Sequence, residues 1–247
     1  MSGLQTPEIW GVDLAAATAG LQLIEERTPR LCPADRARAA GFSDPAVREE
    51  WLATHIALRI LIEHAAGAEW RGATFARSER GKPQLDGAPL AFSLSHAPGL
   101  AVIGLSPCGS IGVDVERTRC VRLVKARRAR IEEAGAALQA APLPDDGEAR
   151  FLQAWVRLEA FAKAEGCGIG RLLTHLGILG TSAAARADQQ SARALIEAML
   201  VSSPSPAVRD LQLGAGVYAA AVFTGVPPTS AISWLPTSVA GLEKLTC

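Results

Sequence analysis

The sequence lacks the features that mark several common protein classes. Its five cysteines, at positions 32, 108, 120, 167 and 247, include no C-x-x-C pair, and their number is odd. This argues against a thiolate zinc site and a disulfide framework, and favours a reducing compartment. No apolar run approaches the roughly 18–20 residues of a membrane span. The N-terminus lacks the basic start and apolar run of a signal peptide. We therefore expect a cytoplasmic protein that does not interact with membranes.

The chain also has no excess of either charge. Lys and Arg together number 25, as do Asp and Glu, so we expect neither nucleic acid nor an anionic membrane as partner. His55 and His64 are nine residues apart, unlike the spacing of an H-E-x-x-H zinc motif. There is no G-x-S-x-G motif for acyl transfer, no glycine-rich nucleotide loop and no repeat of fixed period.

What is present is a mixed series of helices and strands. The 247 residues, 49% of them apolar, suit one large domain or two small ones. Without regular β-α alternation, the order predicts an α/β fold in the broad sense (α+β), with one or two lobes. Proline and glycine at 98–99 and 107–109 favour antiparallel hairpins between neighbouring strands. Helices are expected at residues 20–30, 33–41, 44–66, 121–141, 148–165 and 192–199. Strands are expected at 9–14, 73–77, 90–95, 101–105, 111–116, 216–223 and 231–235.

Residues 112–116, GVDVE, carry the first candidate chemistry. Alternate side chains of a strand share a face, so Asp114 and Glu116 point the same way. Two carboxylates this close repel each other unless a cation lies between them. Hard oxygen ligands of this kind suit Mg²⁺. The alternative is a solvated strand edge with two ordinary acids.

A second candidate group lies on the helix predicted at 148–165. Phe151, Trp155, Glu159 and Lys163 form a single stripe at four-residue spacing. The alternative is a surface Glu–Lys pair worth about 0.3–0.5 kcal/mol. Because Phe151 and Trp155 favour burial, the stripe predicts that Glu159 and Lys163 lie at the edge of a cleft.

Two further segments could bind phosphate. Ser95 and His96 end a strand just before a Pro-Gly turn, and Lys82 and Pro83 form a rigid turn after Gly81. A histidine at a strand end often only bonds a nearby loop, and such turns are common on surfaces. Each segment is weak evidence when it is taken alone.

In this order, the segments at 81–83, 93–96, 112–116 and 155–166 resemble the Sfp-type 4′-phosphopantetheinyl transferases. Residues 48–59 also look like an arginine-bearing helix of that family. Any one motif is weak, but their joint order and spacing are specific. The resemblance covers about residues 30 to 170 well and the last seventy residues loosely.

The resemblance implies Mg²⁺-dependent transfer of phosphopantetheine from coenzyme A to a serine of an acyl- or peptidyl-carrier protein. Asp114, Glu116 and Glu159 would then hold Mg²⁺ against the diphosphate. Glu159, or a metal-bound water, would help to deprotonate the serine, and Lys163 would stabilise or protonate the leaving phosphate of 3′,5′-ADP. The coenzyme A contacts implied by the family are Lys82, Pro83, Ser95, His96 and Lys163.

The family fold consists of two similar α/β subdomains related by a pseudo-twofold axis, with coenzyme A and Mg²⁺ at their interface. This implies a division into residues 1–110, with coenzyme A phosphate contacts, and 111–247, with the Mg²⁺-binding carboxylates. We expect a monomer. A carrier with acidic residues beside its serine could meet Arg127, Arg128 and Arg130 electrostatically.

Two other hypotheses remain open at the level of sequence. One is a different Mg²⁺-dependent phosphoryl-transfer enzyme that uses the same carboxylates. The other is a non-catalytic family member that binds coenzyme A or a carrier protein. Leu158 supports the second, because the family usually has lysine immediately before the helix glutamate.

Overall fold

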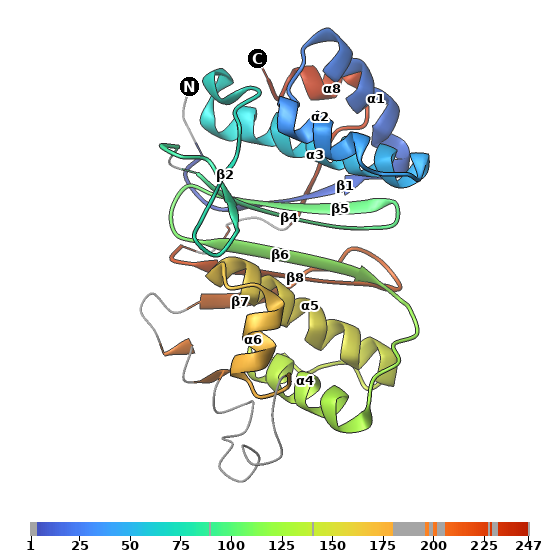
Figure 1. Cartoon of the computed structure of the whole chain (residues 1–247), viewed down its shortest axis with the longest axis vertical. Coiled ribbons are helices and arrows are strands. Elements are labelled where there is room, and N and C mark those ends of the chain that lie inside the picture. Colours follow the sequence, from blue (N-terminus) through green and yellow to red (C-terminus); the bar gives the residue numbers. More distant parts are fainter. Residues whose placement is uncertain are drawn as a thin grey trace. The chain divides into compact units, whose positions relative to one another are not determined.

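A computed structural model describes residues 4–88, 90–139, 141–179, 196–197, 200–201, 206–226, 228 and 232–246 of the chain. The fold is mixed α/β, as the sequence predicts (Figure 1). Two compact units can be distinguished. Unit 1 comprises Met1–Ser78, Pro83–Cys108 and Pro228–Cys247, and unit 2 comprises Glu79–Lys82 and Gly109–Pro227. Residues 228–247, which the division by sequence places in the second half, thus contribute to unit 1.

Unit 1 is built on a four-stranded sheet in the order β4-β5-β1-β9, with helices packed on one face (Figure 1). Strand β1 pairs antiparallel with β5 and parallel with β9. A separate antiparallel ribbon joins β2 to β3. The strands are β1 (Glu8–Asp13), β2 (Ala76–Arg77), β3 (Pro83–Gln84), β4 (Ala91–Ala97), β5 (Leu100–Ser106) and β9 (Ser233–Trp234). The helices are α1 (Leu14–Arg27), α2 (Pro33–Ala40), α3 (Pro45–Ala66), the 3-10 turn η1 (Ala68–Trp70) and α8 (Val239–Glu243).

Helix α3 begins and ends where its sequence predicts. The Asp44 carboxylate accepts a hydrogen bond from the backbone N–H of Ala46 at 2.8 Å, and Pro45 occupies the first turn. Gly67 ends the helix with φ of 113°, a conformation that residues with a Cβ rarely adopt. Between these ends, Ile60 and Leu61 are fully buried in the core of unit 1.

Arg59 of the same helix belongs to the core. It is 2% exposed, bonds the Asp35 carboxylate at 2.6 Å and lies over the Phe75 ring at 3.9 Å. Because its charge is already balanced there, its part in this unit is structural. This leaves Arg48, at an exposed position near the start of the helix, as the other arginine of the segment that resembles the family's arginine-bearing helix.

His55 gives unit 1 a testable pH dependence. Its ring stacks on Trp51 at 3.6 Å, and burial lowers its pKa from 6.5 to about 4. The unfolded chain therefore binds this proton first as the pH falls, so stability is lost on the acid side. We expect the free energy of unfolding to fall by about 1–3 kcal/mol between pH 6.5 and 4.

Urea denaturation across this pH range measures the effect. His55→Gln should flatten the acid-side loss, whereas His64→Gln, at an exposed position of the same helix, should leave it in place. If the free energy of unfolding depends on pH in the same way in the unchanged chain and in His55→Gln, His55 is not the source of the acid-side loss of stability.

Unit 2 is built on a three-stranded antiparallel sheet in the order β6-β8-β7. Helix α5 packs across β6 and β8, and α4 packs against α5 (Figure 1). Leu152, Val156 and Phe161 of α5 are buried in an apolar core with Val222 of β8. The strands are β6 (Ile111–Arg117), β7 (Pro206–Asp210) and β8 (Val217–Thr224). The helices are α4 (Lys125–Ala137), α5 (Gly147–Glu165) and α6 (Ile169–His175).

One predicted hairpin is wrong. The turn at 98–99 does connect the antiparallel strands β4 and β5, but the break at 107–109 does not join β5 to β6 in one sheet. Strand β5 already pairs with β4 on one edge and β1 on the other. Strand β6 instead pairs with β8, so that Asp114 lies opposite Ala220. The helix predicted at 192–199 lies largely outside the described residues.

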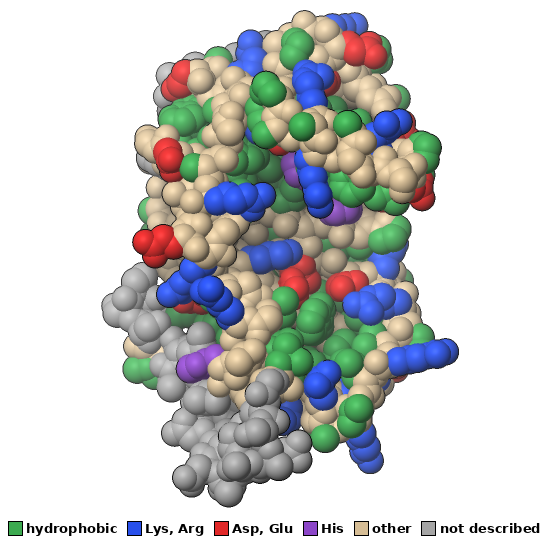
Figure 2. All heavy atoms as spheres, in the orientation of Figure 1, with side chains coloured by type: hydrophobic (Ala, Val, Ile, Leu, Met, Phe, Trp, Pro, Cys, Tyr) green, Lys and Arg blue, Asp and Glu red, His purple; other side chains and the backbone are tan. Residues whose placement is uncertain are grey.

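The distribution of charged side chains on the surface agrees with the equal numbers of basic and acidic residues in the sequence. Figure 2 shows Lys and Arg side chains dispersed among acidic and apolar ones over the face that it draws. Within the described part of the chain, no helix combines the length and the hydropathy needed to cross a bilayer. The pseudo-twofold relation between the halves stays a prediction.

Candidate functional site

The carboxylates of strand β6 lie on the face that α5 covers. Asp114 is 5% exposed, and Glu116 is partly buried near the strand's end. Val113 and Val115, also buried, alternate with them on the opposite face. Because helix α5 covers Asp114, this acid does not lie on the solvated strand edge that was the alternative interpretation of the sequence.

Close packing at Gly112 brings α5 onto this strand. Gly112 lies two residues before Asp114, on the same face, and a Cβ there would overlap the backbone of Ala160 and Ala164. Only glycine allows this approach. The helix itself begins at Asp146, whose carboxylate caps it, and ends at Gly166, which is left-handed with φ of 65°. The two ends of the helix and its close approach at Gly112 together determine which helix side chains lie beside Asp114.

Helix α5 brings Glu159 and Lys163 close to Asp114. The Lys163 ammonium donates to Asp114 Oδ1 at 2.7 Å and to the Val113 carbonyl at 3.1 Å. Burial raises the pKa of the half-buried Glu159 carboxyl, and the negative charges of Asp114 and Glu116 raise it further while Lys163 opposes them. Unit 2 thus gathers three acids and one lysine within electrostatic range.

Glu116 has a partner that the sequence pattern did not reveal. Arg119, three residues later, donates to both carboxylate oxygens at 3.1 and 3.0 Å. Its side chain is 50% exposed, so the pair is worth little to stability. The i, i+3 spacing of opposite charges was the available signal.

These acids form a donor set that fits Mg²⁺ in part. Among the described residues, no group of three His, Cys, Asp or Glu side chains is close enough to hold one ion together. Mg²⁺, however, is usually held by one or two carboxylates with waters and substrate phosphate. Asp114 and Glu159, close enough for their charges to interact, provide that number.

Lys82 also belongs to unit 2, in the turn between β2 and β3. Its ammonium donates to the carbonyls of Ile111 at 2.9 Å and Ala164 at 3.4 Å. Burial lowers its pKa from 10.5 to about 8, and the charge of Glu165 opposes this. Lys82 therefore hydrogen-bonds both the first residue of β6 and a residue near the end of α5. It lies at the contact between β6 and α5 where the acids also lie.

The other predicted coenzyme A contacts lie in unit 1. Ser95 is buried and His96 exposed at the end of β4, and Pro83 is exposed on the short β3. His96 is opposite Ala101 in the hairpin register. Their predicted role in binding coenzyme A stays a prediction.

Comparison with known proteins identifies relatives of this chain. A scan against family models found no match. The chain is 30% identical over 162 residues to a putative 4′-phosphopantetheinyl transferase, slr0495, of Synechocystis sp., covering 56% of this chain and 64% of the relative. It is 29% identical over 171 residues to the 4′-phosphopantetheinyl transferase HetI of Nostoc sp., covering 66% and 70%. The chain thus spans slightly less than two thirds of the first of these relatives.

The chain is therefore similar to proteins named 4′-phosphopantetheinyl transferase. Leu158, at the position where the resemblance leads us to expect a lysine, is fully buried in the apolar core of unit 2. Arg157 does not replace that lysine, because its guanidinium is fully buried and bonds Asp210 at 2.6 and 2.9 Å. The lysine of α5 that contacts Asp114 is Lys163.

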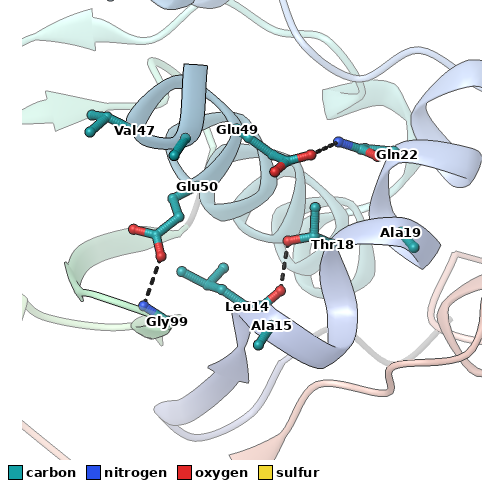
Figure 3. Close-up of a pocket in the computed structure, with 10 residues that line it drawn as sticks. Leu14, Ala15, Thr18, Ala19, Gln22, Val47, Glu49, Glu50 and Gly99 are labelled. Atoms are coloured by element: carbon teal, nitrogen blue, oxygen red, sulfur yellow. Dashed lines mark hydrogen bonds between the residues drawn. The ribbon is translucent and has the colours of Figure 1, made fainter. Parts of the chain in front are cut away.

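Unit 1 contains a groove of its own, between the first turns of α1 and α3 (Figure 3). Its volume is about 560 Å³. The polar groups that Figure 3 draws bond to one another: Glu50 accepts from the Gly99 N–H at 2.9 Å, and Gln22 donates to Glu49 at 3.0 Å. Because these groups satisfy each other, we assign the groove no ligand.

Proposed function

We propose that this protein transfers the 4′-phosphopantetheine group of coenzyme A to a serine of an apo acyl- or peptidyl-carrier protein and releases 3′,5′-ADP. The observation that supports this best is the meeting of Asp114, Glu159 and Lys163 at the contact of β6 and α5. Two relatives that carry the name of this activity strengthen the proposal.

The proposed roles follow from the chemistry of each group. Mg²⁺, when bound, would neutralise charge on the diphosphate. Asp114 and Glu159 would hold it, and Glu116 would become a third ligand only by leaving Arg119 and moving toward the ion. Burial and the neighbouring acids raise the pKa of Glu159, and a bound cation would oppose this shift, so that Glu159 is the ionised carboxylate that accepts a proton.

In the reaction, the serine oxygen forms a bond to the phosphorus next to the pantetheine, and the bond from that phosphorus to the oxygen of 3′,5′-ADP breaks. The serine proton passes to Glu159. Lys163, an ammonium beside Asp114, stabilises or protonates the leaving phosphate. Lys82, Pro83, Ser95 and His96 are proposed as further contacts to coenzyme A, the cationic ones with its phosphates.

The proposal includes a monomer in the cytoplasm, without a nucleic acid or membrane partner. The carrier is defined only by its class: a small protein that presents a serine beside acidic residues. Arg127 and Arg128 of α4 are candidates for its electrostatic contact.

Mass spectrometry of carriers tests the proposal. Purified protein, coenzyme A, Mg²⁺ and a panel of apo carriers should give a carrier mass increase of one phosphopantetheine group, with 3′,5′-ADP as co-product. Reactions without coenzyme A or with excess chelator are the controls. Coenzyme A binding without turnover on any carrier would favour a non-catalytic member instead. Absence of both binding and transfer would refute the proposal.

A further inference from the structure

The edge of β6 that faces away from β8 carries backbone carbonyls outside the sheet. Among the described strands, β6 pairs with β8 alone. The Ser110 carbonyl, just before the strand, accepts the Thr224 N–H of β8 at 3.0 Å. Successive residues of an antiparallel strand direct their N–H and C=O groups to opposite edges. The carbonyls of Ile111 and Val113 therefore point away from β8 and need donors from elsewhere.

Two lysines supply those donors. Lys82 donates to the Ile111 carbonyl at 2.9 Å, and Lys163 donates to the Val113 carbonyl at 3.1 Å. Carbonyls two residues apart on a strand are separated by about 7 Å, so the two ammonium groups occupy consecutive positions along one edge. Lys163 also bonds Asp114 at 2.7 Å. Its position is thus set along the same stretch of backbone that Lys82 bonds.

Lys82 also bonds the last turn of α5. It donates to the Ala164 carbonyl at 3.4 Å, and Ala164 follows Lys163 directly. The last four carbonyls of a helix have no donor within the helix, and a cation is favourable at this end of the helix dipole. The charge of Glu165, in the same turn, favours the charged form of Lys82. Lys82 therefore stabilises the end of α5 through both a hydrogen bond and its charge.

Gly112, next to Ile111 in β6, lies where strand and helix approach closely. A Cβ at Gly112 would overlap the Ala160 oxygen and the Ala164 nitrogen. Gly112 permits this approach but has no side chain to maintain it. An ammonium has three donors and can bond both backbones at once. Lys82 therefore maintains the contact that Gly112 permits.

We infer that Lys82 is a positioning residue for the transfer reaction: by joining β6 to the end of α5, it sets the position of the Lys163 ammonium relative to Asp114. This inference rests on the proposed function. It differs from the phosphate contact proposed for Lys82 above, because a contact acts on the affinity for coenzyme A whereas positioning acts on turnover. A misplacement of about 1 Å at such a site can cost about 10²-fold in rate.

Lys82→Met tests the inference, because methionine keeps an unbranched apolar stem and removes both bonds. Lys82→Arg retains a charged donor and should recover most of the loss. Arg80→Met, at an exposed position two residues earlier in the same turn, also removes a cation and is the matched control. Lys82→Gln, whose shorter uncharged amide cannot span both carbonyls, replaces Lys82→Met if that variant does not fold.

Kinetics, calorimetry and hydrogen exchange are the measurements. In Lys82→Met, kcat for carrier modification should fall about 10–10²-fold. The dissociation constant of 3′,5′-ADP, which carries nucleotide phosphates but does not react, should stay close to that of the unchanged chain. The amides of residues 162–166, in the last turn of α5, should exchange faster because the helix end has lost a bond. Arg80→Met should leave kcat and this exchange as they are in the unchanged chain.

The outcomes separate this inference from the proposed function. An unchanged kcat in Lys82→Met overturns it. A loss confined to the Michaelis constant of coenzyme A and the affinity for 3′,5′-ADP also overturns it, and would make Lys82 a phosphate contact alone. If the unchanged chain modifies no carrier, the transferase is overturned, and faster exchange confined to Lys82→Met still supports Lys82 as the residue that joins β6 to α5. Equal exchange in Lys82→Met and Arg80→Met, in such a chain, overturns both.

Discussion

Asp114→Ala is expected to reduce phosphopantetheine transfer by about 10³-fold or more, since removal of one charge-stabilising group from such a site costs about 10²–10³-fold and the metal contribution adds to it. Asp114 contributes the carboxylate that Lys163 bonds at 2.7 Å and that raises the pKa of Glu159. Its loss would remove a proposed metal ligand and the carboxylate that Lys163 bonds.

Folding should survive this change. Removal of a buried carboxylate relieves its repulsion of Glu159, and Lys163 keeps its bond to the Val113 carbonyl. Initial rates of carrier modification and circular dichroism measure the two effects. Asp145→Ala, an exposed acid of unit 2, is the control and should retain full activity. A rate like that of the unchanged chain in Asp114→Ala would refute the assignment of metal and catalytic roles to Asp114.

Arg157→Met is expected to lower the free energy of unfolding by about 3–5 kcal/mol, because it leaves one partner of a buried ion pair uncompensated. The fully buried guanidinium bonds Asp210 twice, and its remaining donors bond the carbonyls of Gly135 at 3.3 Å and Ala141 at 3.1 Å. It therefore joins α5 to β7 and to the connection between α4 and α5.

Denaturant unfolding measures this loss. Arg150→Met, in the first turn of the same helix and 41% exposed, is the control and should cost less than about 1 kcal/mol. Addition of Asp210→Leu to Arg157→Met should recover part of the stability, since no unpaired charge then remains. A cost below about 1 kcal/mol for Arg157→Met would mean that water already compensates Asp210.

Much of the local structure could be predicted from the sequence. Helices α3 (Pro45–Ala66) and α5 (Gly147–Glu165) match the predicted ranges 44–66 and 148–165 to within one residue. The four-residue stripe on α5 correctly placed Glu159 and Lys163 together. These features depend on contacts within a few residues along the chain, which is the range over which a sequence pattern is informative.

The sequence named candidate residues for the site but did not predict the surroundings of each side chain. The two-residue period put Asp114 and Glu116 on one face, yet gave no information about which face a helix covers. The burial of Asp114 follows from Gly112, whose missing Cβ admits the backbone of α5. The family pattern assigned Lys82 to coenzyme A phosphates, whereas its bonds to the Ile111 and Ala164 carbonyls depend on tertiary packing.

By itself, the sequence determined the mixed α/β class, the limits of helices α3 and α5, and the set of acids and lysines that resembles a transferase site. It placed α1, which runs from Leu14 to Arg27, several residues too late. Only the tertiary structure decided that β6 pairs with β8, about a hundred residues later, instead of with the adjacent β5. It also decided that Arg157 is balanced by Asp210 in the core of unit 2. Pairings of this kind depend on which strand edge and which buried charge remain available once the chain is packed. No local pattern contains that information.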